Sequence, residues 1–75
     1  MNKTKNHINP NKLLLSKWTA VIPVNKEKHF IVVKVNRDDN DIVTSCLLEA
    51  VINHHEMDIN WQCLQDNQLW LTGWK

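Results

Sequence analysis

Residues 28–36 read Lys-His-Phe-Ile-Val-Val-Lys-Val-Asn and carry the most regular apolar pattern of the chain. β-branched and aromatic residues fill this stretch, which favours an extended strand. Successive side chains of a strand point to opposite faces, so the pattern divides the stretch in two. The predicted faces are Ile31, Val33 and Val35 on one side and Phe30, Val32 and Lys34 on the other.

Three further segments show the alternation of a strand. Residues 17–22 alternate until Pro23, which lacks the N–H that a strand ladder needs. Residues 42–52 also fit helical spacing, but the polar turns on both sides of them favour a strand. In residues 57–62 every second side chain is large and apolar, which predicts a fourth strand.

The two ends of the chain predict a tail and two short helical elements. Residues 1–8 are polar and rich in lysine, which is typical of a flexible tail. Asn9 and Pro10 suit the N-cap and the first position of a helical turn. Asp66 can cap a short final helix, and Gly73 follows as the residue that tolerates a positive φ.

Together these elements predict a mainly β fold. We expect a flexible polar tail over residues 1–8 and a single small β domain over residues 9–75. Short strands separated by polar turns are typical of a small SH3-like antiparallel barrel or a curled sheet of four to five strands. The short C-terminal helix is expected to close one end of it.

Length and composition exclude several functional classes. The chain has 75 residues, of which 43% are hydrophobic and 23% charged, so it is expected to fold around a small core. Its apolar runs are only a few residues long, which predicts neither a membrane span nor a signal peptide. A single glycine excludes Gly-rich phosphate loops. We therefore expect a cytoplasmic protein without enzymatic activity.

The cysteines and histidines do not have the spacing of metal ligands. No C-x₂-C or H-x₃₋₅-H pair occurs, and His54 and His55 are adjacent in a turn. Without a secretion signal, Cys46 and Cys63 are expected to be reduced and buried, with a disulfide as the alternative. The sequence therefore predicts no metal, no other cofactor and no small-molecule substrate.

Basic and acidic residues are separated along the chain. Residues 1–37 carry eight lysines and arginines and one acidic residue, whereas residues 38–75 carry one lysine and seven acidic residues. One prediction is a basic binding face opposite an acidic one. The alternative is that the strands interleave and the charges pair across them.

The chain has four tryptophans and no tyrosine. Trp18 and Trp61 occupy inward positions of predicted strands and are expected in the core. Trp70 and Trp74 are expected either in the core or exposed beside lysines, where an indole can stack on a base or grip a peptide. The candidate interaction residues are Lys17, Lys26, Lys28, His29, Trp70 and Trp74.

Several strings resemble one known family. They are LLLSKWTAV at 13–21, EKHF at 27–30, LEAV at 48–51, DINW at 58–61 and WLTGW at 70–74. With them the chain, over residues 8–75, resembles the small tryptophan-rich bacterial protein family of unknown function. This resemblance implies a stand-alone bacterial cytoplasmic domain with no established activity or cofactor.

One turn departs from the family pattern. The turn after residues 48–51 is usually basic in the family, whereas here residues 53–56 read Asn-His-His-Glu. Ordinary histidine becomes charged near pH ~6.5. Binding at this turn is therefore expected to strengthen in acid.

The sequence predicts a small non-enzymatic binding module. The first prediction is a protein partner recognised through the surface. The alternative is nucleic acid, bound by the basic N-terminal half with a tryptophan as a stacking platform. We expect no membrane association, and a monomer.

Overall fold

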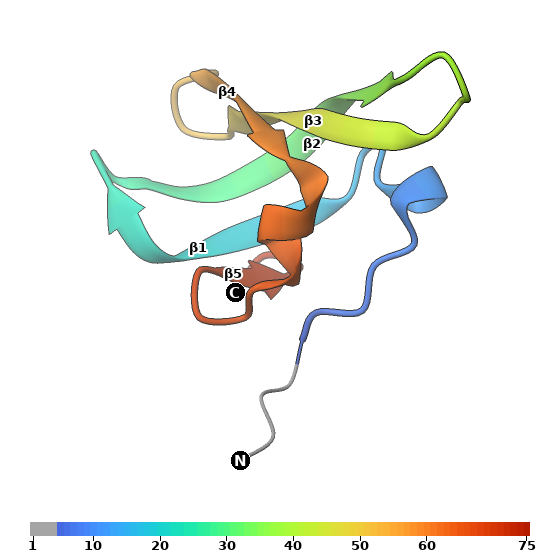
Figure 1. Cartoon of the computed structure of the whole chain (residues 1–75). Helices are drawn as coiled ribbons and strands as arrows, with labels where there is room; N and C mark the ends of the chain where they lie inside the picture. The colour runs from blue at the N-terminus through green and yellow to red at the C-terminus, as the bar shows by residue number, and fades with distance from the viewer. Residues whose placement is uncertain (1–4) are drawn as a thin grey trace.

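The computed structural model describes residues 5–75, which form one antiparallel sheet of five strands (Figure 1). The strands are β1 (Lys17–Val24), β2 (Glu27–Arg37), β3 (Val43–Ala50), β4 (Glu56–Asn60) and β5 (Trp70–Thr72). Two short 3₁₀ helices complete the described chain, η1 (Pro10–Lys12) and η2 (Trp61–Gln65). The strand order is β4-β3-β2-β1-β5, so β4 and β5 are the edges and the sheet does not close into a barrel.

A bulge in β2 decides which of its side chains face the core. Val32 pairs with Leu48 of β3, and Lys34 pairs with the adjacent Leu47. Val33 is therefore one extra residue in β2. An extra residue reverses the alternation beyond it. Val35 therefore packs against the core with Phe30, and the prediction that these two residues lie on opposite faces was wrong.

Residues 6 and 8 contact η2, β5 and the core. The backbone N–H of Asn6 donates to Gln65 O at 3.0 Å, and its Nδ2 donates to Leu64 O and Trp70 O, both at 2.8 Å. Ile8 packs against the core. Two residues of the predicted flexible tail, Asn6 and Ile8, therefore contact the folded part of the chain, and residues 1–4 lie outside the described residues.

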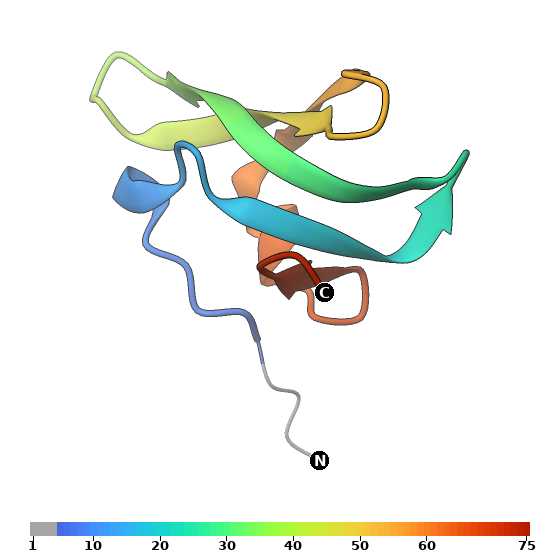
Figure 2. The same ribbon diagram turned by 180° about the vertical axis from the view of Figure 1, so that it is seen from behind.

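The predicted C-terminal helix was wrong. The Oδ1 of Asp66 accepts a hydrogen bond from Gln68 N, but this turn leads into β5 rather than into a helix. Pairing with β1 places Trp70 opposite Ala20, which gives the segment ladder hydrogen bonds and buries the indole. Gly73 then adopts a φ of 77°, as predicted, and the chain turns back toward β1 (Figure 2).

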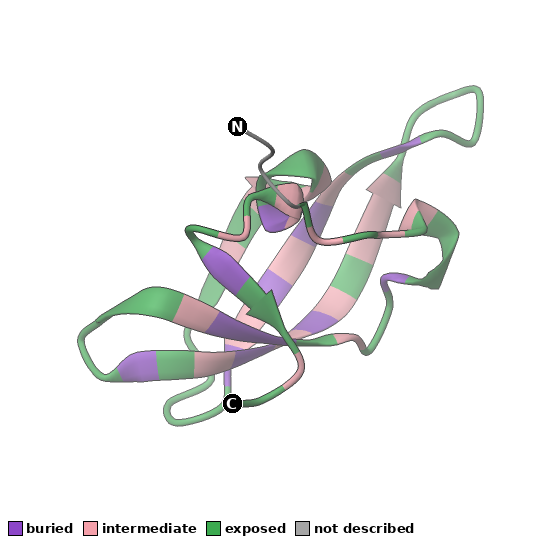
Figure 3. Cartoon of the chain, turned by 90° about the horizontal axis from the view of Figure 1, so that it is seen from below, coloured by how far each residue is buried: buried purple, intermediate pink, exposed green. Residues whose placement is uncertain are grey.

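The core lies on the concave face of the curled sheet. Figure 3 shows buried positions along the strands and exposed positions at the hairpin tips. The helix η2 crosses between β4 and β5, and its Leu64 is fully buried. The buried apolar residues are Leu13, Trp18, Phe30, Val32, Val43, Cys46, Leu48, Ala50, Leu64 and Trp70.

Candidate binding pocket and outer tryptophan cluster

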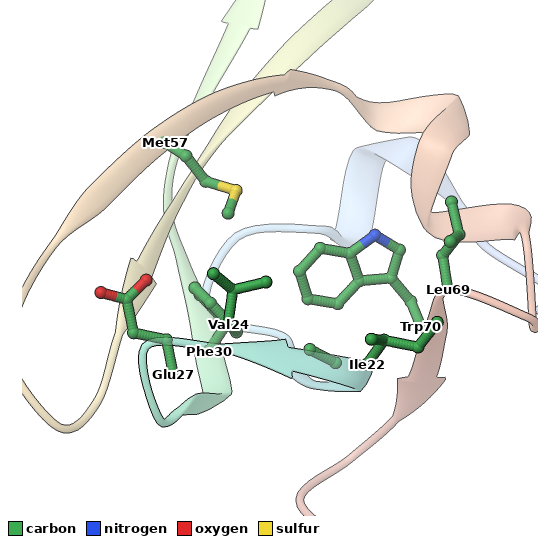
Figure 4. Close-up of a pocket in the computed structure, with 8 residues that line it drawn as sticks. Ile22, Val24, Glu27, Phe30, Met57, Leu69 and Trp70 are labelled. Atoms are coloured by element: carbon green, nitrogen blue, oxygen red, sulfur yellow. The ribbon is translucent and has the colours of Figure 1, made fainter.

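An open pocket of about 230 Å³ lies on the concave face, next to the β1–β2 hairpin (Figure 4). A bend in β1 shapes it. Between the Thr19–His29 and Val24–Glu27 pairs, β1 has the residues 20–23 where β2 has only Lys28. The strand therefore moves away from its neighbour at Pro23, where no ladder donor is needed. The pocket is lined by Ala20, Ile22, Val24, Glu27, Phe30, Met57, Leu69 and Trp70.

Apolar side chains surround the mouth of the pocket and remain in solvent. Ile22 is 72% exposed, Val24 65% and Leu69 48%. Beneath them Phe30 and Trp70 pack edge to face, with ring centroids 5.3 Å apart. Scattered apolar residues on a surface are ordinary, but a group of them around a hollow is typical of a contact site.

Trp70 lines this pocket, and its indole N–H is an unused hydrogen-bond donor on the side of the ring away from Val24 (Figure 4). The other three indoles donate at 2.8–3.1 Å: Trp18 to Ser16 Oγ, Trp61 to Val43 O and Trp74 to Phe30 O. Within residues 5–75, the Nε1 of Trp70 has no partner, although this residue is only 9% exposed. No fully buried polar side-chain atom among these residues lacks a partner, so this N–H reaches solvent.

Glu27 is the acidic residue of the pocket and is almost buried, with 8% exposure. Asn53 Nδ2 donates to its Oε2 at 2.8 Å, and His55 Nδ1 lies 3.2 Å from both carboxylate oxygens. The hydrogen bond from Asn53, and next that from His55, holds the pKa of the Glu27 carboxyl below its ordinary value of 4.5, against the effect of burial. The pocket therefore carries a negative charge at neutral pH.

The opposite face of the sheet carries a second feature, the outer tryptophan cluster of Lys17, His29 and Trp74. Trp74 is 45% exposed, and Lys17 Nζ lies 4.7 Å from the centroid of its ring. The His29 and Trp74 rings lie 6.2 Å apart. The Oγ1 of Thr19 donates to Gly73 O at 2.7 Å and accepts from Lys75 N at 2.9 Å, which holds the chain end over this face.

The structure brings together three of the six predicted interaction residues, those of the outer tryptophan cluster. Trp70 lies on the concave face instead, because it pairs with Ala20 while the following Leu71 pairs with Thr19. Lys28 is an exposed residue of β2, and Lys26 is exposed in the β1–β2 turn with a φ of 65°.

The sequence reasoning missed most of the pocket. Ile22 and Val24 on both sides of Pro23 were a usable signal for the pocket. Proline interrupts the hydrogen-bond ladder, so apolar residues beside it are free to serve a contact site instead of the strand pairing. Glu27, the single acidic residue among the first 37, was another. Met57 and Leu69 carried no such signal, because only the curl of the sheet brings them to the pocket.

Ion pairs between basic and acidic side chains are few among residues 5–75. Within residues 5–75 no lysine lies within 4.0 Å of a carboxylate, so the predicted pairing across strands is not seen for lysine. The ion pairs there are Arg37–Asp41 at 3.8 Å, His54–Glu49 at 2.9 Å and His55–Glu27 at 3.2 Å. The strand order explains this, because β1 and β2 lie on one side and β3 and β4 on the other.

The two thiols differ. Both are free; Cys46 is buried as predicted, whereas Cys63 in η2 is exposed, contrary to the prediction. Burial, with smaller effects of Asp58 and Cys63, raises the pKa of the Cys46 thiol to about 11. Since the thiolate is the nucleophile, this shift disfavours reaction of Cys46 at neutral pH.

Residues 5–75 show neither a metal-binding cluster nor a membrane-spanning helix. No group of three or more His, Cys, Asp or Glu side chains there is arranged to hold a metal ion. No helix in the same range has the length and apolar character needed to cross a membrane.

A comparison with protein families matches residues 16–75 to the family described as Tryptophan-rich protein (DUF2389). The chain belongs to this family. The resemblance seen in the sequence strings is thereby confirmed. No curated protein and no solved structure matches the chain. All four tryptophans lie in the matched part; Trp18 and Trp70 are buried and Trp61 packs against the core, while Trp74 lies on the outer surface.

Proposed function

We propose that this member of the tryptophan-rich family is a non-enzymatic binding module for a protein partner, and that the pocket receives an apolar side chain of that partner. The observation that carries the proposal is the exposure of Ile22, Val24 and Leu69 around a hollow. Complete burial of one aliphatic side chain contributes about 1.5–3 kcal/mol to the free energy of binding, so it would be one part of a larger contact.

We also propose that the curled sheet is an incomplete barrel of the SH3-like kind. Five antiparallel strands support this: β1 to β4 follow one another in meander order, and β5 returns beside β1 after the 3₁₀ helix η2. On this view the pocket forms where the barrel remains open.

Peptide selection from a random library on the immobilised chain tests the binding proposal. We expect the selected peptides to share one large aliphatic position. Ile22→Ser should weaken their binding about tenfold, because it removes apolar area at the mouth of the pocket. Ile52→Ser is the matched control, since Ile52 is 62% exposed and lies outside the pocket. Equal losses in both variants, or no selection at all, would contradict the proposal.

Single-stranded nucleic acid is the second candidate, and the outer tryptophan cluster favours it. An exposed indole beside lysines can stack on a base while the ammonium groups contact phosphates. Against it, the Trp74 ring already carries the ammonium of Lys17, which a base would have to displace. Titration with an unstructured oligonucleotide at several salt concentrations tests this candidate. If nucleic acid binds through phosphate contacts, the logarithm of the affinity should fall with the logarithm of the salt concentration, by a slope of about −0.7 per contact. A flat response removes this candidate.

A further inference from the structure

Resting on the proposed function, we propose that the partner segment carries a basic residue next to its apolar one: the apolar side chain fills the pocket, Glu27 pairs with the basic group, and the Trp70 indole donates to a carbonyl of the same segment. Three features of the pocket lead to this partner.

The first feature is the charge of Glu27. A docked segment would take the remaining surface of this carboxylate out of water, and an uncompensated charge there opposes binding. A carboxylate accepts about four hydrogen bonds, whereas among residues 5–75 only Asn53 and His55 bond to it. Acceptor capacity therefore remains for an ammonium or guanidinium group, which also supplies the opposite charge.

The second feature is the indole N–H of Trp70. This residue is nine-tenths buried, yet its donor has no partner within residues 5–75. A carbonyl oxygen is the most abundant acceptor that a polypeptide presents. A segment that covered this N–H without bonding to it would lose about 1–3 kcal/mol, so the donor selects segments with a carbonyl at this position.

The third feature is size. Pockets for drug-sized ligands and cofactors measure roughly 300–1,000 Å³. This one measures about 230 Å³ and is open on one side. It therefore suits one aliphatic side chain of a longer segment. Glu27 and Trp70 lie on opposite sides of the pocket, so both can meet groups that flank that side chain (Figure 4).

Three blocked peptides test the inference directly: acetyl-Gly-Leu-Lys-Gly-amide, its Lys→Gln form and its Leu→Ser form. The four indole N–H resonances of the ¹⁵N-labelled protein report on them, assigned from single Trp→Phe variants. We expect the Leu-Lys peptide to move the Trp70 signal and to leave those of Trp18 and Trp61 in place. Its affinity should exceed that of the Leu-Gln form about tenfold.

Two protein variants complete the design. Glu27→Gln should remove the preference for the Leu-Lys peptide, whereas Glu56→Gln, which removes an exposed carboxylate outside the pocket, should keep it. Because the Leu-Lys and Leu-Gln peptides are compared on the unchanged protein, the test does not depend on the folding of Glu27→Gln.

The outcomes separate the inference from the proposed function. Equal binding of the Leu-Lys and Leu-Gln peptides, with the Trp70 signal shifted by both, overturns the basic residue but supports the pocket. Binding of the Leu→Ser form as tight as that of the Leu-Lys peptide shows surface attraction only and overturns the inference. Failure of every leucine peptide to move the Trp70 signal contradicts the proposed function as well.

Discussion

Trp70 and Trp74 are four positions apart in the chain and lie on opposite faces of the sheet. Trp70 is buried against Phe30 on the concave face. Trp74 lies on the outer face because the chain reverses at Gly73, and its Nε1 donates to Phe30 O at 2.9 Å. The same residue type therefore supports the core at one position and forms surface at the other.

These two positions predict different losses of stability. Trp70→Ala should lower the free energy of unfolding by about 3–5 kcal/mol, as large-to-small core changes do. Trp74→Ala should cost about 1–2 kcal/mol, from one hydrogen bond, the contact with Lys17 and partial burial. Urea unfolding followed by circular dichroism measures both. A larger loss for Trp74→Ala would contradict the assignment of the two faces.

Glu27 predicts how stability depends on pH. Its pKa is lower in the folded state than the ordinary 4.5, so the unfolded chain binds the proton more tightly. The contribution of Glu27 is therefore fully present above about pH 4.5 and is lost as the pH falls through the lower folded pKa. Thermal unfolding from pH 6 to pH 3 should show a steeper loss in the unchanged protein than in Glu27→Gln.

A matched variant controls for the loss of charge itself. Glu56→Gln removes one carboxylate outside the pocket and should keep the steep acid loss of the unchanged protein. Identical pH profiles for the unchanged protein and Glu27→Gln would show that the bonds from Asn53 and His55 do not favour the ionised carboxylate.

At the level of elements, the extra residues in the strands shape the sheet. The extra residue Val33 reverses which face the following side chains of β2 point to. Residues 20–23 bend β1 away from β2, which opens the pocket. The strands themselves were predictable, because alternation and polar turns act over a few residues. The bulges were not, since an extra residue is defined only relative to the neighbouring strand.

The turn after β5 predicts a local effect of replacing its glycine. Gly73 has a φ of 77°, and no atom lies within 4 Å of where a Cβ would be. Gly73→Ala should therefore cost about 1–2 kcal/mol through backbone strain alone, without a clash. Thermal unfolding measures this loss, and faster exchange of the Trp74 indole N–H should accompany it. An unchanged melting temperature would contradict the strained turn.

At the level of the whole molecule, the reactivities of the Cys46 and Cys63 thiols can show whether the sheet opens. A thiol-reactive dye should label Cys63 at once in the folded protein, because its side chain is exposed. Cys46 is fully buried, so it should react only as fast as the protein unfolds. Mass spectrometry of timed samples measures both rates. Rapid labelling of Cys46 in native buffer would contradict the buried core.

The order of the basic and acidic strands is also a property of the whole molecule. The strand order keeps the basic strands β1 and β2 together and the acidic strands β3 and β4 together. The sequence left two charge arrangements open, and of these the structure bears only on pairing across strands, where it shows ion pairs of Arg37, His54 and His55. Among the candidate site residues, the cluster around Trp74 included residues predicted from the sequence, whereas the pocket contained only Trp70 of that set.

The sequence alone determined the mainly β class, the approximate positions of four strands, the left-handed conformation of Gly73 and the membership of the tryptophan-rich family. Each of these depends on patterns within a few residues or on short sequence motifs shared with the family. The tertiary structure decided the edge strand β5, the inward side of Val35, the faces of Trp70 and Trp74, and the pocket beside Glu27. These features depend on pairing between distant segments, whose hydrogen bonds and burial outweigh local preference.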